Sequence, residues 1–352
     1  MPICGDYLVG MWGSGIIGFS QTTNQISLEF MKISFLQAYE GDCIHIEHEG
    51  HHVVIDGGPK CEELESVVKY IVSNQEKIDL LIITHYDEDH ILGIYNILLK
   101  LSSKVRLKDL IGEVWFDATK IGYKGNPYNL SANQARNLSD LLIRSDVNWI
   151  SEVTRGKQFH FDDNAWLEVL YGGEIFDAMS DNRNLGGVSC DWDTPLPVLE
   201  SYVDDLVLDK SKTNSESIII VVHVGDGKQV LLPGDATPDK LLPALQDYVD
   251  GGNSNCFSLI KLPHHGSYRN LTKDILGMIE CDEYMICSNG DKHFLPSKKT
   301  LLKVSKWGRK SKGDYFLFHF NYYAELFPKM NISEQDMKNY HIACDGQRCF
   351  EF

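Results

Sequence analysis

The sequence contains no C-x-x-C motif, although nine cysteines are scattered along its 352 residues. Scattered cysteines of odd number argue against a disulfide framework or a zinc knuckle and favour buried, reduced thiols. No apolar run approaches the ~20 residues that a membrane-spanning helix needs. The first residues lack the basic segment and long apolar core of a signal peptide. We therefore expect a cytoplasmic protein with no membrane partner.

Positive charge is also scarce: 33 lysine and arginine residues face 50 aspartate and glutamate residues, for a formal net charge of −17. Proteins that grip long nucleic acids usually present a basic face, because phosphate neutralisation supplies much of the affinity. The charge balance therefore argues against a large duplex footprint. It still allows a local basic patch, a small phosphorylated substrate, or a metal site that needs carboxylates.

The chain is long enough for one large domain or two small ones. Residues 1–30 are rich in Gly, Ser and Thr with weak periodicity, and we expect an N-terminal extension that could be disordered. From residue 31 the pattern is regular, so we expect one domain over 31–352. A polar stretch at about 172–212 predicts a variable insert, because so long a loop is usually a lid, a binding loop or disordered.

Apolar strands alternate with amphipathic segments, which is typical of an α/β protein. We expect strands at 32–37, 43–48, 52–56, 77–84 and 112–117, helices at 61–75, 91–101 and 131–145, a hairpin around 158–171, and an acidic helix-like piece at 198–209. A helix should also begin at Thr237 as cap, with Pro238 at its first position.

Four apolar strands are each followed directly by histidine or aspartate. The first precedes "HYDEDH" at 85–90, the second Asp235, the third His264 and His265, and the fourth a Gly loop with His293. Strand ends are where α/β proteins place ligand groups, because a rigid strand aims them and the following loop leaves them accessible. If these strands lie in packed sheets, their ends can converge on one point.

The segment 85–90 has the composition of a metal site. Alternating residues of an extended loop face one side, so His85, Asp87 and Asp89 can share a face, and His90 can join at the turn into the helix. Imidazole suits zinc and iron, and carboxylates shift the preference towards manganese or magnesium. Two metal ions need a shared ligand, and Asp235 could provide it.

The order of these motifs resembles a known family. "VIDGG" (54–58), "THYDEDH" (84–90), "LLPGDA" (231–236) and "IKLPHHGS" (260–267) resemble the metallo-β-lactamase-fold hydrolases, from about residue 31 to the end. Together with "GDC" (41–43) and "NSESIII" (214–220), they look most like the hydrolase domain of ComEC-type DNA-uptake proteins and their stand-alone relatives. The resemblance implies an αββα sandwich of two mixed β-sheets, with helices outside and metals at one edge.

The resemblance also implies roles for individual residues. His85 and Asp87 match ligands of a first metal, Asp235 matches a bridging carboxylate, and Asp89, His90 and His293 match ligands of a second metal. His264 and His265 match a histidine pair that supplies a ligand or a proton donor, with His265 the ligand we expect. Asp56 matches an aspartate that orders the site from behind.

Two departures from the family pattern stand out. Asp87 replaces the second histidine of the signature, and the frequent third-motif histidine has no clean counterpart. Between the signature at 85–90 and Asp235 the only histidines are His160 and His223, and we expect structural roles for both. The first metal site could then be short of a ligand, or completed by His264 or His265.

Two further groups of charged or ligand-type residues lie outside the main motifs. His45, His48, His51 and His52 cluster around a hairpin turn, where we expect a solvated turn rather than a second metal site. Lys261 and Arg269 flank the H-H-G-S loop, where they could hold a phosphate or form surface salt links.

We therefore expect a metal-dependent hydrolase, most of all a phosphodiesterase or nuclease with two Mn²⁺ or Zn²⁺ ions that activate a water. Asp89 would orient the hydroxide, and Lys261, His264 or His265 would stabilise charge or protonate the leaving oxygen. The expected substrate is a phosphodiester, which could be single-stranded nucleic acid. Alternatives are a small phosphodiester, cyclic nucleotide, thioester or lactone, or an effector controlled by a protein bound to the insert or the C-terminal tail.

Overall fold

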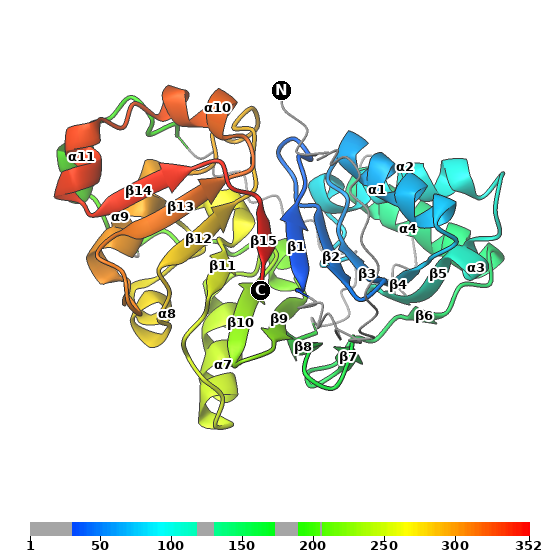
Figure 1. The fold of residues 1–352 in the computed structure, drawn as a ribbon. Coiled ribbons are helices and arrows are strands. Elements are labelled where there is room, and N and C mark those ends of the chain that lie inside the picture. The colour runs from blue at the N-terminus through cyan, green and yellow to red at the C-terminus, as the bar shows by residue number, and fades with distance from the viewer. Residues whose placement is uncertain (1–29, 118–129, 173–188, 205) are drawn as a thin grey trace, which may run out of the picture.

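The computed structural model of the chain describes residues 30–117, 130–172, 189–204 and 206–352. Within these ranges two β-sheets pack face to face, and helices cover their outer faces (Figure 1). Both sheets contain parallel and antiparallel strand pairs. The predicted αββα sandwich is therefore confirmed. The predicted extension at 1–30 lies, apart from its last residue, outside the described residues.

The first sheet has the strand order β15-β1-β2-β3-β4-β5-β6. Its strands are β1 (Lys32–Phe35), β2 (Ile44–His48), β3 (His51–Ile55), β4 (Ile78–Ile82), β5 (Ile111–Trp115), β6 (Trp149–Ile150) and β15 (Cys349–Glu351). The associated helices are α1 (Glu62–Ser73), α2 (Glu88–Leu101), α3 (Leu107–Leu110) and α4 (Leu130–Arg144). β15 pairs with β1, so the last strand of the chain lies beside the first described one.

The second sheet has the order β14-β13-β12-β11-β10-β9-β8-β7. Its strands are β7 (Gln158–His160), β8 (Trp166–Tyr171), β9 (Ile219–Val224), β10 (Lys228–Leu232), β11 (Leu259–Lys261), β12 (Glu283–Ile286), β13 (Phe316–Phe320) and β14 (Ile342–Asp345). Helices in this half are α5 (Leu196–Glu200), α6 (Lys212–Ser215), α7 (Pro238–Asp250), α8 (Lys273–Met278), α9 (Lys298–Trp307), α10 (Tyr323–Leu326) and α11 (Glu334–Asn339).

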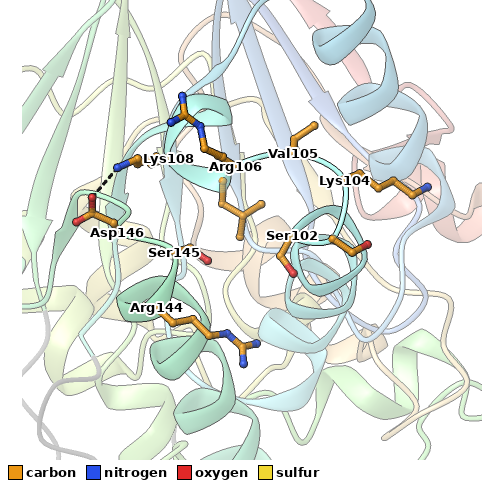
Figure 2. Close-up of a pocket in the computed structure, with 10 residues that line it drawn as sticks. Ser102, Lys104, Val105, Arg106, Lys108, Arg144, Ser145 and Asp146 are labelled. Carbon is orange, nitrogen blue, oxygen red and sulfur yellow. Dashed lines mark hydrogen bonds and ion pairs between the residues drawn. The ribbon is translucent and has the colours of Figure 1, made fainter.

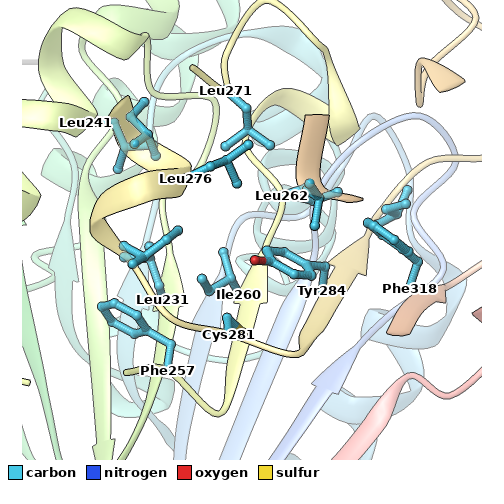
Figure 3. Close-up of a cluster of buried hydrophobic side chains, with 14 of the residues drawn as sticks. Leu231, Leu241, Phe257, Ile260, Leu262, Leu271, Leu276, Cys281, Tyr284 and Phe318 are labelled. Carbon is cyan, nitrogen blue, oxygen red and sulfur yellow. The ribbon is translucent and has the colours of Figure 1, made fainter. Parts of the chain in front are cut away.

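Alternation along the strands separates an inner core from the outer cores. In β10, Val230 and Leu232 belong to the core between the sheets, whereas Leu231 belongs to the core under the helices. Strands that are apolar at every position are covered on both faces in this way. Figure 3 shows the outer core of the second sheet, where Leu231 gathers with Leu241 of α7 and Tyr284 of β12. Strands held on both faces form a rigid platform for the groups at their ends.

The helices follow the apolar spacing of the sequence. Leu64, Val68 and Ile71 lie on one side of α1 and are buried, as the predicted helix at 61–75 requires. α7 begins at Pro238 after Thr237, as predicted. α2 begins at Glu88, three residues earlier than predicted. Its first turn is polar, so the spacing of apolar residues gives no signal for it.

The predicted insert is only partly described, because residues 173–188 lie outside the described ranges. The acidic segment at 198–209 forms no continuous helix: α5 ends at Glu200. Trp192 is buried, and its Nε1 donates a hydrogen bond to the carbonyl of Pro296 at 2.8 Å. Among the described helices, none combines the length and the apolar character that crossing a membrane demands.

Candidate metal centre

Side chains from four strand ends meet at one edge of the sandwich. Nε2 of His90, in the first turn of the helix after β4, lies 3.4 Å from Oδ2 of Asp235, which follows β10. The same oxygen lies 3.4 Å from Nε2 of His265, which follows β11. Asp56, which follows β3, closes the group with Oδ2 2.8 Å from Nδ1 of His90. Residues far apart in the chain are thus neighbours because their strands end at the same edge.

His85 and Asp87 form one side of this group. Nε2 of His85 lies 3.7 Å from Oδ2 of Asp87, and the rings of His85 and His90 have centroids 4.1 Å apart. Nδ1 of His85 faces the hydroxyls of Thr84 and Ser217, at 3.2 and 3.3 Å. These contacts hold the ring so that Nε2 points towards the carboxylates.

Asp89 and His265 form the other side. Oδ2 of Asp89 lies 3.6 Å from Nε2 of His265, while Nδ1 of His265 lies 3.0 Å from the carbonyl of Cys287. A carbonyl only accepts, so Nδ1 donates and Nε2 keeps its lone pair. Burial alone would raise the pKa of Asp89, but His265 and His90 outweigh it and hold that pKa well below its ordinary value.

Asp56 anchors the loop that carries the histidines. Its carboxylate accepts hydrogen bonds from the backbone N of Thr84 at 2.8 Å, from the Thr84 hydroxyl at 2.7 Å, and from Nδ1 of His90 at 2.8 Å. The last bond leaves Nε2 of His90 with its lone pair towards Asp235. This geometry agrees with the ordering role expected for Asp56.

Four buried atoms at this edge have no hydrogen-bond partner among the described residues: Nε2 of His85, His90 and His265, and Oδ1 of Asp235. Leaving such atoms unsatisfied costs about 1–3 kcal/mol each, so native proteins rarely do so without a ligand. Ligand atoms of His85, His90 and Asp235 lie within 4.8 Å of one another, as do those of Asp89, His90 and His265. The donor set of imidazole and carboxylate suits zinc or manganese. These residues could therefore hold two divalent ions that share Asp235.

Protons compete with cations for these nitrogens. Burial alone would lower the pKa of His90 and of His265, but Asp235 outweighs it and raises both pKa values well above the ordinary value. Metal ligands must be deprotonated, so metal affinity at this centre depends on pH.

Lys261 lies beneath the centre rather than in its opening. Its side chain is fully buried, its Nζ donates to the carbonyl of Gly234 at 3.0 Å, and it pairs with Asp42. The ammonium also lies 3.7 Å from Oδ1 of Asp235. Burial alone would lower the pKa of Lys261, but Asp42 and Asp235 raise it above its ordinary value. This position differs from the expected contact with a substrate, because a buried ammonium can only position Asp235 from behind.

Asp42 is a residue that the sequence argument missed. It is buried between Lys261 and His265, with Oδ1 3.3 Å from Nδ1 of His265. The "GDC" segment that contains it carries no periodic or metal-site signal of its own. Asp42 therefore links Lys261, beneath the centre, to His265, whose Nε2 faces the centre.

Asp209 was also missed, and it orients His264. Its Oδ2 lies 3.1 Å from Nδ1 of His264 and accepts hydrogen bonds from the amides of Asn214 at 2.7 Å and Asn270 at 3.0 Å. Burial alone would raise the pKa of Asp209, but His264 and the hydrogen bond from Asn214 lower it to about 2. Nε2 of His264 consequently faces the centre, 3.8 Å from Oδ2 of Asp235. No periodic signal marks Asp209, because it lies in the irregular segment that reads as an insert.

The turn that carries the histidine pair has an unusual backbone. His264, His265 and Gly266 all have positive φ, at 47°, 54° and 85°. For residues other than glycine this region costs energy and is concentrated at functional sites. A Cβ at Gly266 would lie 2.7 Å from Cβ of Pro296, so glycine is required there. The turn aims two neighbouring imidazoles at Asp235.

A family model described as the metallo-beta-lactamase superfamily matches residues 37–175, a range that includes the histidine-rich loop. The chain has the metallo-β-lactamase fold. Comparison with curated proteins gave no match.

Two solved structures illustrate the likeness. The metallo-beta-lactamase fold protein YhfI from Bacillus subtilis is 10% identical with a TM-score of 0.45, over 92% of this chain and 100% of that one. Igni18, a metallo hydrolase from Ignicoccus hospitalis, is 15% identical with a TM-score of 0.40, over 92% of this chain and 99% of that one.

Three other histidines, His293, His160 and His223, were candidates in the sequence. The side chain of His293 is exposed on the loop after β12, and its role as a ligand stays a prediction. His160 is exposed and stacks on Trp166, on which His223 also stacks with a centroid distance of 4.2 Å. The structural roles expected for His160 and His223 agree with these contacts.

A basic recess of about 520 Å³ lies at the far end of α2 (Figure 2). Lys104, Arg106, Lys108 and Arg144 line it, and Lys108 pairs with Asp146 at 2.7 Å. The metal centre lies at the other end of this 14-residue helix, about 21 Å away at 1.5 Å per residue. A local basic patch exists, as the sequence allowed, but it does not line the centre.

Proposed function

We propose that this chain is a metal-dependent hydrolase that cleaves a phosphodiester bond. The observation that carries the proposal is the set of three unpartnered imidazole nitrogens that face the carboxylate of Asp235. His85, Asp87 and Asp235 would hold one ion, and Asp89, His90, His265 and Asp235 the other. When bound, two divalent ions supply a water of lowered pKa and neutralise charge on the phosphoryl oxygens.

Asp89 would orient the attacking water. Its side chain is 18% exposed, whereas His90 is fully buried and Asp235 nearly so, so Asp89 lies nearer to solvent. A carboxylate held by His265 can accept a hydrogen bond from the water and keep one lone pair of the water directed at phosphorus.

His264 would donate a proton to the leaving oxygen. Its side chain is 26% exposed, and Nδ1 is occupied by Asp209. Burial alone would lower the pKa of His264, but Asp235 and Asp209 raise it above its ordinary value. A protonated imidazole with one nitrogen fixed and the other facing the opening is suited to general acid catalysis.

The substrate we favour is single-stranded nucleic acid, and the support is the motif order that resembles ComEC-type hydrolase domains. The carboxylates of the first site favour manganese over zinc. A small phosphodiester is the second candidate, because the net charge of −17 opposes a long polyanion.

The test uses chelator-stripped protein with added Mn²⁺ and three substrates: end-labelled single-stranded DNA, a cyclic nucleotide and bis-nitrophenyl phosphate. We expect Mn²⁺ to restore cleavage of at least one diester, and His85→Ala and Asp235→Ala to abolish it. His160→Ala is the matched control, because His160 is exposed and remote. A manganese-loaded protein inert towards all three, or a fully active Asp235→Ala variant, would overturn the proposal.

A further inference from the structure

A second group of ligand-type side chains lies on the outer face of the first sheet, away from the metal centre. Ile44 and Ile46 of β2 point into the core between the sheets, so the intervening His45 and the next residue, Glu47, point outward. Glu47 is paired directly with His52 of β3, which places His52 on the same outer face. We name His45, Glu47 and His52 the hairpin cluster.

The hairpin cluster is not the solvated turn that the sequence suggested. His45 is 6% exposed and His52 fully buried, and of the four histidines at this hairpin only His51 is well exposed. The cluster is also separate from the metal centre. Asp56 follows the strand that carries His52, four residues further along, which is about 13 Å of extended chain.

The two imidazoles of the cluster turn nitrogen atoms towards each other. Nε2 of His45 lies 3.1 Å from Nδ1 of His52, and the stacked rings have centroids 5.3 Å apart. Two imidazoles bound to one zinc at about 2.0–2.1 Å in a tetrahedron have their nitrogens about 3.3 Å apart. The observed separation therefore needs little adjustment to admit an ion. Ligand atoms of His45, Glu47 and His52 lie within 4.8 Å of one another.

A carboxylate behind His52 sets its tautomer. Oε2 of Glu76, just after α1, lies 2.8 Å from Nε2 of His52. An ionised carboxylate only accepts, so Nε2 carries the hydrogen and Nδ1 presents a lone pair to the cluster. A carboxylate behind a histidine is the usual arrangement at metal-ligating histidines.

We propose that His45, Glu47 and His52 bind a divalent transition-metal ion, such as Zn²⁺ or Co²⁺, at a site distinct from the hydrolytic centre. Two nitrogens and one carboxylate are ligands that suit zinc or cobalt, and a fourth position is left for water. Glu47 also lines a surface recess of about 330 Å³, so this side of the cluster borders solvent. The ion would clamp β2 to β3, and Glu76 would tie the end of α1 to the clamp. Its role is structural, and the proposal does not depend on the proposed hydrolysis.

The competing arrangement is a plain hydrogen bond from Nε2 of His45 to Nδ1 of His52, which the same 3.1 Å separation allows. The metal site and the plain hydrogen bond predict different numbers of metal ions bound per chain. We would titrate the chelator-stripped full chain with Co²⁺, following the visible absorption of the bound ion, and count ions by elemental analysis. His45→Gln removes one ligand, and His51→Gln is the matched control on the same hairpin.

We expect His45→Gln to bind one ion fewer per chain than the wild type, and His51→Gln to bind the same number. In an Asp235→Asn background, which removes the ligand shared by both ions of the hydrolytic centre, the cluster should still take up one ion and lose it on adding His45→Gln. Glu76→Gln should weaken the cluster ion about 10–100-fold. Diester hydrolysis by His45→Gln should equal that of the wild type, so failure at this cluster is separable from failure of the proposed function.

A folded His45→Gln variant with wild-type stoichiometry would overturn the proposal and leave the hydrogen bond as the explanation. If His45→Gln does not fold, Glu47→Gln decides, because Glu47 is only partly buried at the strand surface. A cobalt affinity unchanged in Glu47→Gln overturns the site, and a weakened one supports it.

Discussion

Replacing Asp209 by asparagine should slow hydrolysis only for substrates whose leaving oxygen needs a proton. Oδ2 of Asp209 lies 3.1 Å from Nδ1 of His264, and the amide of asparagine would keep this size but remove the charge. General acid catalysis contributes about 10²–10⁴-fold to a rate. Because His264 itself remains, we expect the lower end, a loss of about 100-fold in kcat for an alkyl phosphodiester such as DNA.

The pH dependence should change in a defined direction. Asp209 is one of the charges that raise the pKa of His264. His264 must be protonated to donate, so activity is present below its pKa and lost as the pH rises through it. Removing the Asp209 charge lowers that pKa, and the alkaline limb of the pH–rate profile should move to lower pH.

The assay compares kcat for a DNA oligonucleotide with kcat for bis-nitrophenyl phosphate across the pH range, in wild type and Asp209→Asn. A nitrophenolate leaves with little help from an acid, so its hydrolysis should be nearly unchanged. Equal losses for both substrates would refute the reasoning and assign Asp209 to folding or to metal geometry. An unshifted alkaline limb would refute it as well.

Three further substitutions test buried contacts of the fold. Lys261→Met should destabilise the protein by about 3–5 kcal/mol in urea unfolding, because two buried carboxylates lose their cation, and a smaller loss would contradict its role beneath the centre. Gly93→Ala should lower the free energy of unfolding in urea by about 1–3 kcal/mol, because a Cβ there would lie 2.0 Å from the carbonyl oxygen of Gly57. A variant as stable as the wild type would show that α2 can move away from Gly57. Burial raises the pKa of Asp117 to about 7, so its stabilising contribution is full below the ordinary pKa and lost as the pH rises through 7. Asp117→Asn should therefore be more stable than wild type at pH 8, by at most about 4 kcal/mol, and equal stability of the two at pH 8 would contradict the raised pKa.

The elements with strong periodicity could be predicted from the sequence. The run predicted as a buried strand at 77–84 contains β4, which spans Ile78–Ile82, and the spacing of Leu64, Val68 and Ile71 marks the buried side of α1. The meeting of His90, Asp235 and His265 could also be anticipated, because each follows an apolar strand and strand ends share an edge.

Other features depend on contacts that no local pattern records. Asp209 reaches His264 across 55 residues from an irregular segment. Lys261 stands inside an apolar run, and only the fold reveals that its partners are Asp42 and Asp235 beneath the centre. The burial of His52 arises from neighbouring β4 and the end of α1, whereas its own sequence reads as a polar turn.

The most direct test of the account is anomalous diffraction at the manganese edge from crystals of the chain soaked in Mn²⁺. We expect anomalous peaks within bonding distance of the Nε2 atoms of His85, His90 and His265 and of the carboxylate of Asp235. A soaked crystal without a peak at this edge of the sandwich, with these four side chains ordered, would contradict the claim that they form a metal centre.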